Sequence, residues 1–309
     1  MVQANLKKIV VICGPTAVGK TAVATQLAKQ FEGEIVNADS GQVWRGLNIG
    51  TAKPNTTACQ LVPHHVIDVV NPDEHFDASS YLQLADDAIL QIITRHKNPF
   101  VVGGTGMYLR MLVHGLCDAP PRDPALRAEL EKEIDAHGIE RLHERFKKID
   151  PVSASVVHAR DRTRIIRALE VFEATGIPAS EFYKRHQFEA QRYDAIKIGL
   201  DLPRKELYQK IDERVDQMLK QGWIEEVENL MVHYNINQQA FAAIGYQELM
   251  SHIKGEIDFD TACDLIKRNS RRYAKRQLTW FRADHDIHWF HPSQMTEIAD
   301  IIRRFLGSN

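Results

Sequence analysis

Near its amino end the chain reads Lys7-Lys-Ile-Val-Val-Ile-Cys-Gly-Pro-Thr-Ala-Val-Gly-Lys-Thr21. The apolar run before Gly14 is typical of a parallel strand that is buried on both faces. The residues after it match the Gly-x-x-x-x-Gly-Lys-Thr pattern of a phosphate-binding loop, or P-loop, set between a strand and a helix. They are Gly14, Pro15, Thr16, Ala17, Val18, Gly19, Lys20 and Thr21.

This loop has the chemistry to hold a chain of phosphates. Its glycines let backbone N–H groups converge on phosphate oxygens, and the N-terminus of the following helix adds a favourable dipole. Lys20 supplies a positive charge, and the Thr21 hydroxyl is a candidate ligand for Mg²⁺. The motif strongly predicts phosphate binding but leaves the phosphate compound open.

The rest of the chain predicts an α/β fold. Strands that alternate with helices favour a P-loop NTPase-like parallel sheet flanked by helices. We expect further strands at 34–38, 65–70, 100–102 and 195–202, and helices at 21–31, 78–95, 204–221, 223–234 and 259–283.

A helical insertion interrupts this pattern. The stretch Asp118-Ala-Pro-Pro-Arg-Asp-Pro124 has three prolines in seven residues, which is typical of a domain boundary. Residues 125–185 show helical periodicity and no convincing strand, and Asp161 is the expected N-cap of one of their helices. We therefore predict a core domain formed by residues 1–117 and 195–309, and a smaller all-helical insertion domain formed by residues 118–194.

The composition is that of an ordinary globular enzyme. Hydrophobic residues make up 44% of the 309 residues, and the formal net charge is −2. No apolar run is long enough for a signal peptide or a membrane span, so we expect a cytoplasmic protein, monomeric by default. The four cysteines are scattered without a Cys-x-x-Cys pair, which predicts neither a zinc site nor a disulfide framework.

Asp39 is a second candidate site residue. A usual NTPase places an acid after a buried strand to hold magnesium, but the strand at 100–102 runs into Gly103-Gly-Thr-Gly106 instead. Asp39 follows the strand at 34–38. The local sequence leaves three roles open for its carboxylate, namely a Mg²⁺ ligand, a general base or the N-cap of a helix.

Positive charge is concentrated in two segments. Residues 268–282 contain six basic side chains and no acid, and residues 158–167 contain four arginines and one aspartate. Either cluster alone is most often only a solvated helix face. Two such clusters in a chain with net negative charge indicate an extended anion, with RNA as the leading candidate.

Seven blocks of sequence follow one another from about residue 8 to residue 282. They are the P-loop, Asp39-Ser-Gly-Gln-Val-Trp-Arg-Gly-Leu-Asn-Ile-Gly-Thr-Ala-Lys-Pro54, Pro63-His-His-Val-Ile-Asp68, Val102-Gly-Gly-Thr-Gly-Met-Tyr-Leu-Arg110, Arg164-Ile-Ile-Arg-Ala-Leu-Glu170, Ala243-Ile-Gly-Tyr-Gln-Glu-Leu249 and Tyr273-Ala-Lys-Arg-Gln-Leu-Thr-Trp-Phe-Arg282. Together these blocks resemble the bacterial tRNA dimethylallyltransferase family, also called tRNA isopentenyltransferases. The P-loop alone is not specific to this family, whereas the ordered set is.

The resemblance implies that a dimethylallyl group moves from dimethylallyl diphosphate to N6 of adenosine-37 in tRNA, with release of diphosphate. The P-loop would then hold a prenyl diphosphate rather than split ATP, which accounts for the missing acid after Val102. By resemblance Asp39 is the base that takes the N6 proton, Arg214 clamps the diphosphate from the far side, and Thr105 lies near the substrate nucleotide. Mg²⁺ is the implied cofactor, with Thr21 as a ligand.

The resemblance also implies that the protein holds the anticodon stem-loop of tRNA, with adenosine-37 flipped out of its stack. The helical insertion would grip the anticodon stem, and neither a membrane nor an obligate protein partner is implied. The implied tRNA contacts are Asp39, Ser40, Gly41, Gln42, Thr105, Arg127, Thr163, Arg164, Ile165, Ile166, Arg167, Ala242, Ala243, Ile244, Gly245, Tyr246, Gln247, Lys275, Arg276, Gln277, Leu278, Thr279, Trp280, Phe281 and Arg282.

Two positions depart from the family pattern. The family often has a larger residue in place of Gly41 and a tyrosine in place of Trp44, so any side-chain contact at position 41 is lost here. Eukaryotic relatives carry a C-terminal zinc finger, for which this chain has no ligand pairs.

Two other functions compete with this one. A P-loop kinase for nucleotides or small metabolites would use the same phosphate site, but it leaves the basic segment 268–282 unexplained. A non-catalytic RNA-binding protein with a relic P-loop would have no need for an intact Lys20, Thr21 and Asp39.

Overall fold

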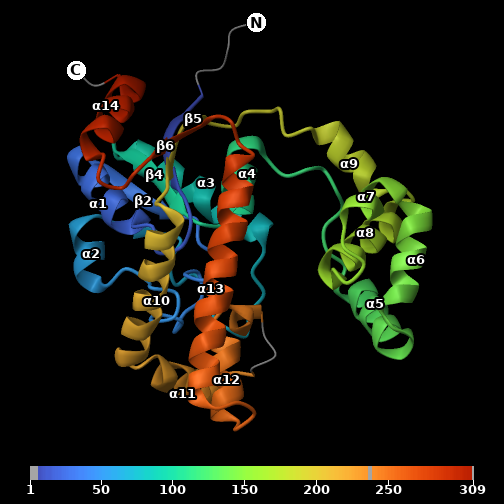
Figure 1. The fold of residues 1–309 in the computed structure, drawn as a ribbon. Coiled ribbons are helices and arrows are strands. Elements are labelled where there is room, and N and C mark those ends of the chain that lie inside the picture. Colours follow the sequence, from blue (N-terminus) through green and yellow to red (C-terminus); the bar gives the residue numbers. More distant parts are fainter. Residues whose placement is uncertain (1–5, 236–238, 308–309) are drawn as a thin grey trace, which may run out of the picture. The chain divides into compact units, whose positions relative to one another are not determined.

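The computed structural model describes residues 6–235 and 239–307 (Figure 1). The chain forms two compact units, a core unit of Met1–Val113 with Arg192–Asn309 and an insertion unit of His114–Gln191. The sequence placed these boundaries a few residues later in the chain. Hydrogen bonds inside the core unit explain the shift, because Arg192 bonds through its backbone to Val113 and through its guanidinium to Leu112 and Asp86.

The core unit is built on a six-stranded parallel sheet in the order β3-β2-β4-β1-β5-β6. The P-loop strand β1 lies between β4 and β5, and its residues from Ile9 to Cys13 are all buried. This placement confirms the parallel sheet that the apolar run predicted. The strands are β1 (Lys8–Cys13), β2 (Gly33–Asn37), β3 (His64–His65), β4 (Asn98–Gly103), β5 (Asp194–Leu200) and β6 (Ile287–Phe290).

Helices cover both faces of the sheet. Val10 and Ile12 of β1 pack with α1 (Lys20–Gln30) and α14 (Met295–Leu306), while Ile9 and Val11 pack with α3 (Ala78–Thr94) and α4 (Gly106–His114). Alternate residues of one strand therefore enter two different apolar cores, as the two-residue period of a strand requires. Figure 1 shows α1 and α3 on opposite sides of the strands.

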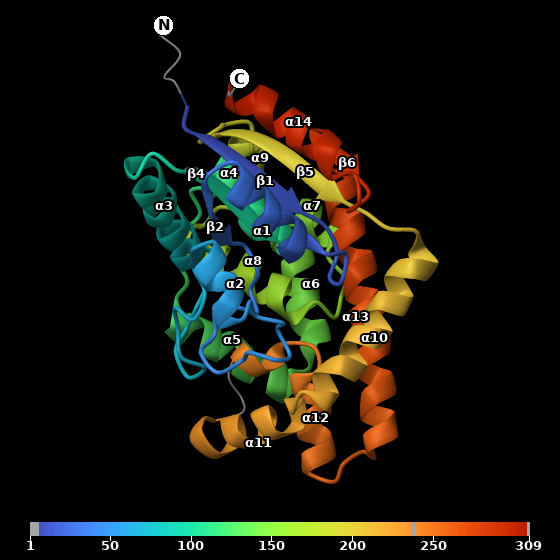
Figure 2. The ribbon, with the colours of Figure 1, turned by 90° about the vertical axis from the view of Figure 1, so that its left-hand side faces the viewer.

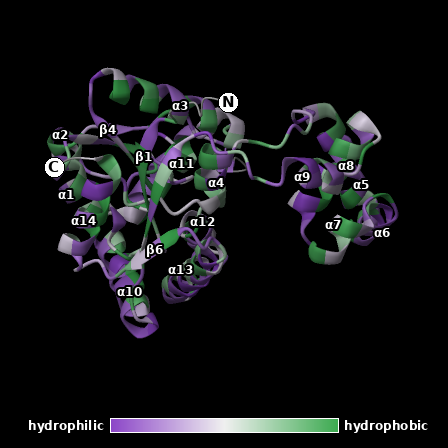
Figure 3. Ribbon diagram, turned by 90° about the horizontal axis from the view of Figure 1, so that it is seen from above, coloured by the Kyte–Doolittle hydropathy of each residue, from purple (hydrophilic) through white to green (hydrophobic). Residues whose placement is uncertain are grey.

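Four further helices complete the core unit after β5. They are α10 (Arg204–Lys220), α11 (Trp223–His233), α12 (Tyr246–Ile253) and α13 (Phe259–Arg282), with a short 3₁₀ turn at Gln239–Ala242 before α12. Figure 2 shows α11 and α12 beyond the end of the sheet, and in Figure 3 α13 is mostly coloured as hydrophilic. The remaining short helix of this unit is α2 (Thr56–Leu61).

Most of the predicted strands and helices are confirmed, with one correction at 65–70. Only His64–His65 pairs with β2, because Val66 and Asp68 have φ values of 61° and 55°, which no strand accommodates. The chain turns there, and Val70 forms a single bridge to Trp44. The sequence did not predict β6 or α14. β6 is a short edge strand with one buried residue, so its apolar pattern is weak.

The insertion unit contains helices and no strand within its fully described residues 114–191. The Asp161 side chain accepts a hydrogen bond from the Arg164 amide and caps the fourth of these helices, as predicted. Leu142, Phe146 and Leu169 are fully buried in a separate apolar core. The helices are α5 (Pro124–His137), α6 (Ile139–Ile149), α7 (Pro151–Val156), α8 (Arg162–Thr175) and α9 (Ala179–His186).

No helix in the described parts of either unit is both long and apolar enough to cross a membrane.

Candidate active site

The P-loop backbone between β1 and α1 has positive φ angles at two glycines. Gly14 and Gly19 have φ values of 142° and 99°, and a Cβ on Gly14 would lie 2.6 Å from the Leu200 carbonyl oxygen. Gly14 therefore permits both the turn and the close approach to β5. No side chain caps the N-terminus of α1 at Gly19, so the amides of its first turn are available to an anion.

Three charged groups from separate parts of the chain act on one another at this loop. Burial is the main reason that the pKa of Lys20 falls to about 8, with Asp39 opposing the shift and Arg214 adding to it. Burial also lowers the pKa of Arg214, again against the effect of Asp39. The structure thus brings together the P-loop lysine, the carboxylate after β2 and the arginine of α10.

Asp39 caps a turn and not a helix. One of its carboxylate oxygens accepts a hydrogen bond from the Gly41 amide at 2.9 Å, and the chain continues in turns. The N-cap role that the sequence left open is therefore excluded. Thr105 fixes the next residue, since its Oγ1 accepts the Ser40 amide at 2.9 Å and donates to the Ser40 hydroxyl.

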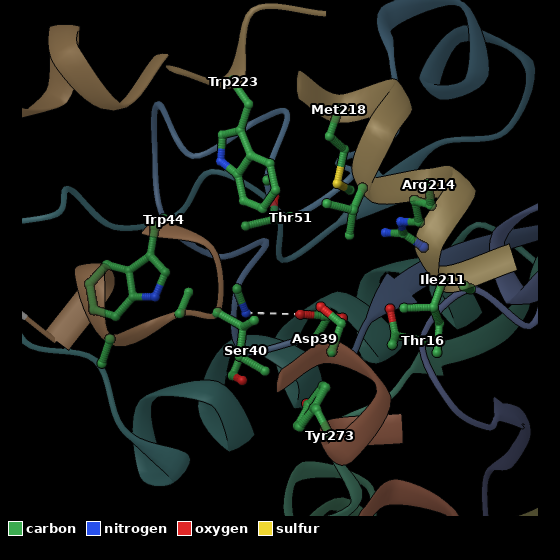
Figure 4. Close-up of a pocket in the computed structure, with 18 of the residues that line it drawn as sticks. Thr16, Asp39, Ser40, Trp44, Thr51, Ile211, Arg214, Met218, Trp223 and Tyr273 are labelled. Carbon is green, nitrogen blue, oxygen red and sulfur yellow. Dashed lines mark hydrogen bonds between the residues drawn. The ribbon is translucent and has the colours of Figure 1, made fainter. Parts of the chain in front are cut away.

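Asp39 lies on the wall of a cavity of about 450 Å³ within the core unit. Figure 4 shows Asp39 between two kinds of surroundings, with Thr16 and Arg214 to one side and the rings of Trp44 and Trp223 to the other. One region of the cavity is polar and continuous with the P-loop, and the other is aromatic. The lining residues also include Ile211, Val215, Met218, Ala242, Ala243, Ile244, Tyr273 and Arg276.

A second, much smaller cavity lies on the other side of Asp39. Lys20, Thr21, Asn37 and His64 line it together with Asp39. Asp39 therefore faces both the large cavity and the groups that surround the beginning of α1.

Glu226 of α11 holds the loop that forms one wall of the large cavity. Its carboxylate accepts the amides of Asn48, Ile49 and Gly50, at 2.9, 2.8 and 3.3 Å, and the Tyr246 hydroxyl at 2.7 Å. A charged acceptor shared among several donors is a strong anchor. It fixes the loop on which Trp44 and Gly41 reach the cavity.

The Trp223 ring is also fixed by close backbone contacts. A Cβ on Gly50 would lie 2.2 Å from its Nε1, and a Cβ on Gly245 would lie 2.0 Å from its edge. Because only glycine permits such an approach from both sides, the sequence sets the position of the aromatic wall.

Helix α13 presents its basic residues on different faces. Arg271 pairs with Asp212 at 2.5 Å and Arg282 with Asp201 at 2.9 Å. The other four basic residues of the predicted cluster are exposed and make no ion pair within residues 6–235 and 239–307. They are Arg268, Arg272, Lys275 and Arg276.

The basic cluster of the insertion unit is largely paired. Arg167 donates to the fully buried Glu170 at 2.9 Å, and Arg127 lies 4.0 Å from the same carboxylate. Arg162 and Arg164 pair with Asp135 and Asp161 on the surface. Arg127 and Arg167 thus stabilise the helices of this unit, whereas the side chains of Thr163 and Arg164 are exposed.

The structure divides the implied tRNA contacts into accessible and buried side chains. Ser40, Ala242, Gln247, Thr279 and Trp280 are exposed, and Gly41, Ala243, Ile244 and Leu278 are partly exposed. Six others are buried within the protein, so they are closed to RNA in this conformation. These are Gln42, Ile165, Ile166, Tyr246, Gln277 and Phe281, and Gly245 is buried with them.

Sequence reasoning missed most of the cavity wall. Ile211, Val215 and Met218 surround Arg214 on one face of α10, so the signal was present as a charged residue within an apolar helical stripe. Trp223 and Glu226 gave no local signal, because their role depends on a loop that is distant in sequence. Tyr273 appeared only as the first residue of the last of the seven sequence blocks.

No cluster of three or more His, Cys, Asp or Glu side chains suited to a metal ion occurs in the described chain. The four cysteines are free.

Comparisons with known proteins give a consistent result. The sequence matches the IPP transferase family over residues 42–284 and the isopentenyl transferase family over residues 7–68. It is 46% identical over 308 residues to the tRNA dimethylallyltransferase of Geobacter sulfurreducens, with 99% of each chain covered.

Solved structures are similar along nearly the whole chain. The full-length tRNA isopentenylpyrophosphate transferase of Bacillus halodurans has a TM-score of 0.73 and 39% identity, with 97% of each chain covered. A eukaryotic dimethylallyltransferase acting on tRNA has a TM-score of 0.80 and 28% identity, with 94% of this chain and 75% of that chain covered.

Proposed function

This chain belongs to the IPP transferase family, and on that premise we propose that it transfers a dimethylallyl group from dimethylallyl diphosphate to N6 of adenosine-37 in tRNA. The observation that carries the proposal is the position of Asp39. Its carboxylate faces the P-loop lysine at the smaller cavity, and in the large cavity it lies between Arg214 and the aromatic rings. The comparisons give no support to a P-loop kinase.

The P-loop and Arg214 bind and stabilise the leaving diphosphate. The uncapped amides at the start of α1 and the Lys20 ammonium supply donors, and Arg214 adds a planar guanidinium from α10. As the bond between the prenyl carbon and oxygen breaks, negative charge grows on the diphosphate. Donors that are already in place stabilise this charge without reorganisation.

Asp39 removes the proton from the attacking amine. The exocyclic N6 is a poor nucleophile because its lone pair is delocalised into the purine, so a positioned base assists the attack. N6 forms a bond to the prenyl carbon, the carbon–oxygen bond to diphosphate breaks, and the N6 proton passes to the Asp39 carboxylate. The Gly41 amide and the Thr105–Ser40 contacts hold this carboxylate in place.

The residues around the smaller cavity fit a Mg²⁺ ion that is shared with the diphosphate. This ion usually takes one or two protein oxygen ligands and completes its shell with substrate phosphates and water. The Thr21 hydroxyl would hold it there. When bound, Mg²⁺ neutralises part of the charge on the leaving diphosphate.

The exposed basic face of α13 binds the phosphate backbone of tRNA. Arg268, Arg272, Lys275 and Arg276 supply four unpaired cations, and Trp280 offers an exposed ring for stacking. The target adenine leaves its stack and enters the large cavity. The insertion unit holds the anticodon stem through exposed residues such as Arg164, and the protein works as a cytoplasmic monomer.

Mass spectrometry of tRNA tests this function. Purified protein is incubated with unmodified tRNA, dimethylallyl diphosphate and Mg²⁺, and the RNA is then digested to nucleosides. We expect a dimethylallyl adduct on adenosine-37 and release of one diphosphate for each transfer. ATP turnover in a parallel incubation with ATP, without an adduct in the first, would favour the kinase instead.

A further inference from the structure

Gln277 stands apart from its neighbours on α13. It lies two residues after Lys275 and two before Thr279, both of which are exposed, yet only 5% of its own surface is accessible. A buried polar side chain needs partners, because an unsatisfied amide in the interior is costly. The partners of Gln277 lie on two loops of the active site.

The Gln277 carboxamide joins these two loops through its two ends. Its Oε1 accepts the backbone amide of Thr16 at 2.8 Å, and its Nε2 donates to the Gly104 carbonyl at 2.9 Å. A carboxamide has both an acceptor and a donor at its tip, which this bridge requires. The bridge also explains the glycine at 104, since a Cβ there would lie 2.2 Å from Nε2.

Both loops carry groups of the proposed reaction. Thr16 belongs to the P-loop, which holds the diphosphate. Gly104 immediately precedes Thr105, whose hydroxyl fixes the amide of Ser40 beside the base Asp39. One side chain therefore sets the position of the phosphate loop relative to the loop that orients the base.

We propose that Gln277 is a positioning residue, which fixes the P-loop for the diphosphate from the inner face of the helix whose outer face binds tRNA. This inference rests on the proposed function and replaces the role of tRNA contact that the resemblance implied for Gln277. Helix α13 then acts on both substrates through opposite faces. The cations of its outer face bind tRNA, and the Gln277 bridge on its inner face positions the P-loop for the diphosphate.

The bridge leads to a specific prediction for diphosphate binding. Without it, the Thr16 amide loses its acceptor and the P-loop becomes free to adopt other conformations, so the diphosphate must order the loop as it binds. The exposed cations of α13 keep their positions, because the buried residues Ala274 and Phe281 still pack the helix against the core. Diphosphate affinity falls while tRNA affinity does not.

Two variants test this prediction. Gln277→Met removes both hydrogen bonds at nearly constant length, and Gln277→Glu keeps an acceptor but replaces the donor with a charge that repels diphosphate. Inorganic pyrophosphate binding is measured by calorimetry, tRNA binding by filter retention, and KM is determined for each substrate. We expect roughly tenfold weaker pyrophosphate binding and a similar rise in KM for dimethylallyl diphosphate, larger for Gln277→Glu, with tRNA affinity unchanged.

Two further variants serve as controls. Lys275→Gln, on the outer face, should weaken tRNA binding and leave pyrophosphate binding intact. Gln217→Met makes the same chemical change at an exposed position of α10 and should alter neither affinity.

Weaker tRNA binding with normal pyrophosphate binding would show that Gln277 contacts RNA and would overturn the inference. A lower Tm with no change in either affinity would do the same, because it would reduce the bridge to a purely structural role. Hydrogen exchange on the wild-type protein needs no variant, and rapid exchange of the Thr16 amide would contradict the bridge. An absence of transfer by the wild-type protein would refute the proposed function instead, and the pyrophosphate comparison would still stand.

Discussion

At the scale of single residues, the Asp39 carboxylate combines two tasks. One oxygen accepts the Gly41 amide and so aims the group, while the carboxylate as a whole is the proposed proton acceptor. Asparagine has nearly the same shape and keeps an acceptor for the Gly41 amide, but it cannot take a proton at neutral pH. The two tasks can therefore be separated by one substitution.

We expect Asp39→Asn to lower the transfer rate about 100-fold or more, as is typical for loss of a general base. Pyrophosphate binding should be retained or strengthened, because the change leaves Lys20 and Arg214 without an opposing charge nearby. Single-turnover transfer and calorimetry measure the two effects. A normal transfer rate in this variant would remove Asp39 from the proton transfer.

The lowered pKa of Lys20 predicts that diphosphate binding depends on pH. Burial depresses its pKa to about 8 in the free protein, so the ammonium loses its proton as the pH rises through that value. A neutral amine no longer attracts phosphate, and affinity should fall above pH 8, by up to about tenfold per pH unit. Arginine keeps its charge throughout this range.

The measurement is pyrophosphate binding at constant ionic strength between pH 7 and pH 9.5, in wild type and in Lys20→Arg. The comparison between the two proteins cancels the titration of the ligand itself. We expect the affinity of the wild type to decline relative to that of Lys20→Arg. Parallel profiles would show that Lys20 stays charged across the range.

The sequence predicted the residues of the site that belong to local motifs. The P-loop and Asp39 each follow a buried strand, and the carboxyl ends of parallel strands meet at one edge, so these residues had to lie close together. Trp223 and Glu226 could not be predicted, since their partners at 48–50 lie on a distant loop. The burial of Gln277 could not be predicted for a related reason, because a sequence block does not say which side of a helix faces inward.

At the scale of secondary structure elements, α13 has three chemically distinct faces. Gln277 lies on its inner face. On a second face, Lys267 pairs with Asp216 of α10 and Arg271 pairs with Asp212 of the same helix. The outer face is cationic. The sequence counted all the basic residues of 268–282 together. The structure shows that Arg271 and Arg282 are neutralised within the protein, so the charge available to RNA is smaller than the count.

The outer face of α13 predicts a specific salt dependence. We expect the triple variant Arg272→Gln, Lys275→Gln and Arg276→Gln to weaken tRNA binding and to reduce the slope of log affinity against log salt by roughly 2 to 3. Titrations between 50 and 300 mM salt measure the slope. Arg304→Gln, at an exposed position of α14, serves as the control and should leave it unchanged.

An unchanged slope in the triple variant would mean that this face of α13 does not contact phosphate. A reduced slope together with weaker pyrophosphate binding would mean that the outer face also contributes to the diphosphate site.

Elements with strong periodicity were predictable, and those fixed by tertiary contacts were not. The buried run of β1 and the capped helix α8 follow directly from their residues. In contrast, the segment 65–70 has an apolar composition that suits a strand, but Val66 and Asp68 adopt positive φ so that Val70 can pair with Trp44. The competing interaction is a long-range backbone bridge, which local propensity cannot reveal.

At the scale of the whole molecule, the core unit is one fold made from two stretches of chain. β1 pairs with β4 from the first stretch and with β5 from the second, so the central strand depends on both. Asp86 accepts hydrogen bonds from Arg192 at 2.5 Å and from the Tyr193 hydroxyl at 2.6 Å, which fixes the return of the chain. An insertion between Val113 and Arg192 therefore leaves the core intact.

The separate cores predict that the two units lose their structure independently. Phe146 is fully buried in the core of the insertion unit, so Phe146→Ala should destabilise that unit by about 3 to 5 kcal/mol. Hydrogen exchange followed by peptide mass spectrometry at increasing urea reports each unit separately. We expect peptides from 124–186 to lose protection at lower urea, while peptides from β1 and β4 keep the wild-type profile.

The matched variant is Ile12→Ala, which removes a fully buried side chain from β1 in the core unit. It should lower the urea concentration at which peptides of the core unit lose protection, and it should abolish tight pyrophosphate binding. Phe146→Ala should leave pyrophosphate affinity at the wild-type value. Because pyrophosphate binds only the folded P-loop, a saturating concentration should protect the core unit alone. Phe146→Ala would contradict this prediction if it lowered the protection of β1 and β4 to the same extent as that of α6. The two units would then unfold as one cooperative structure, although their apolar cores are separate.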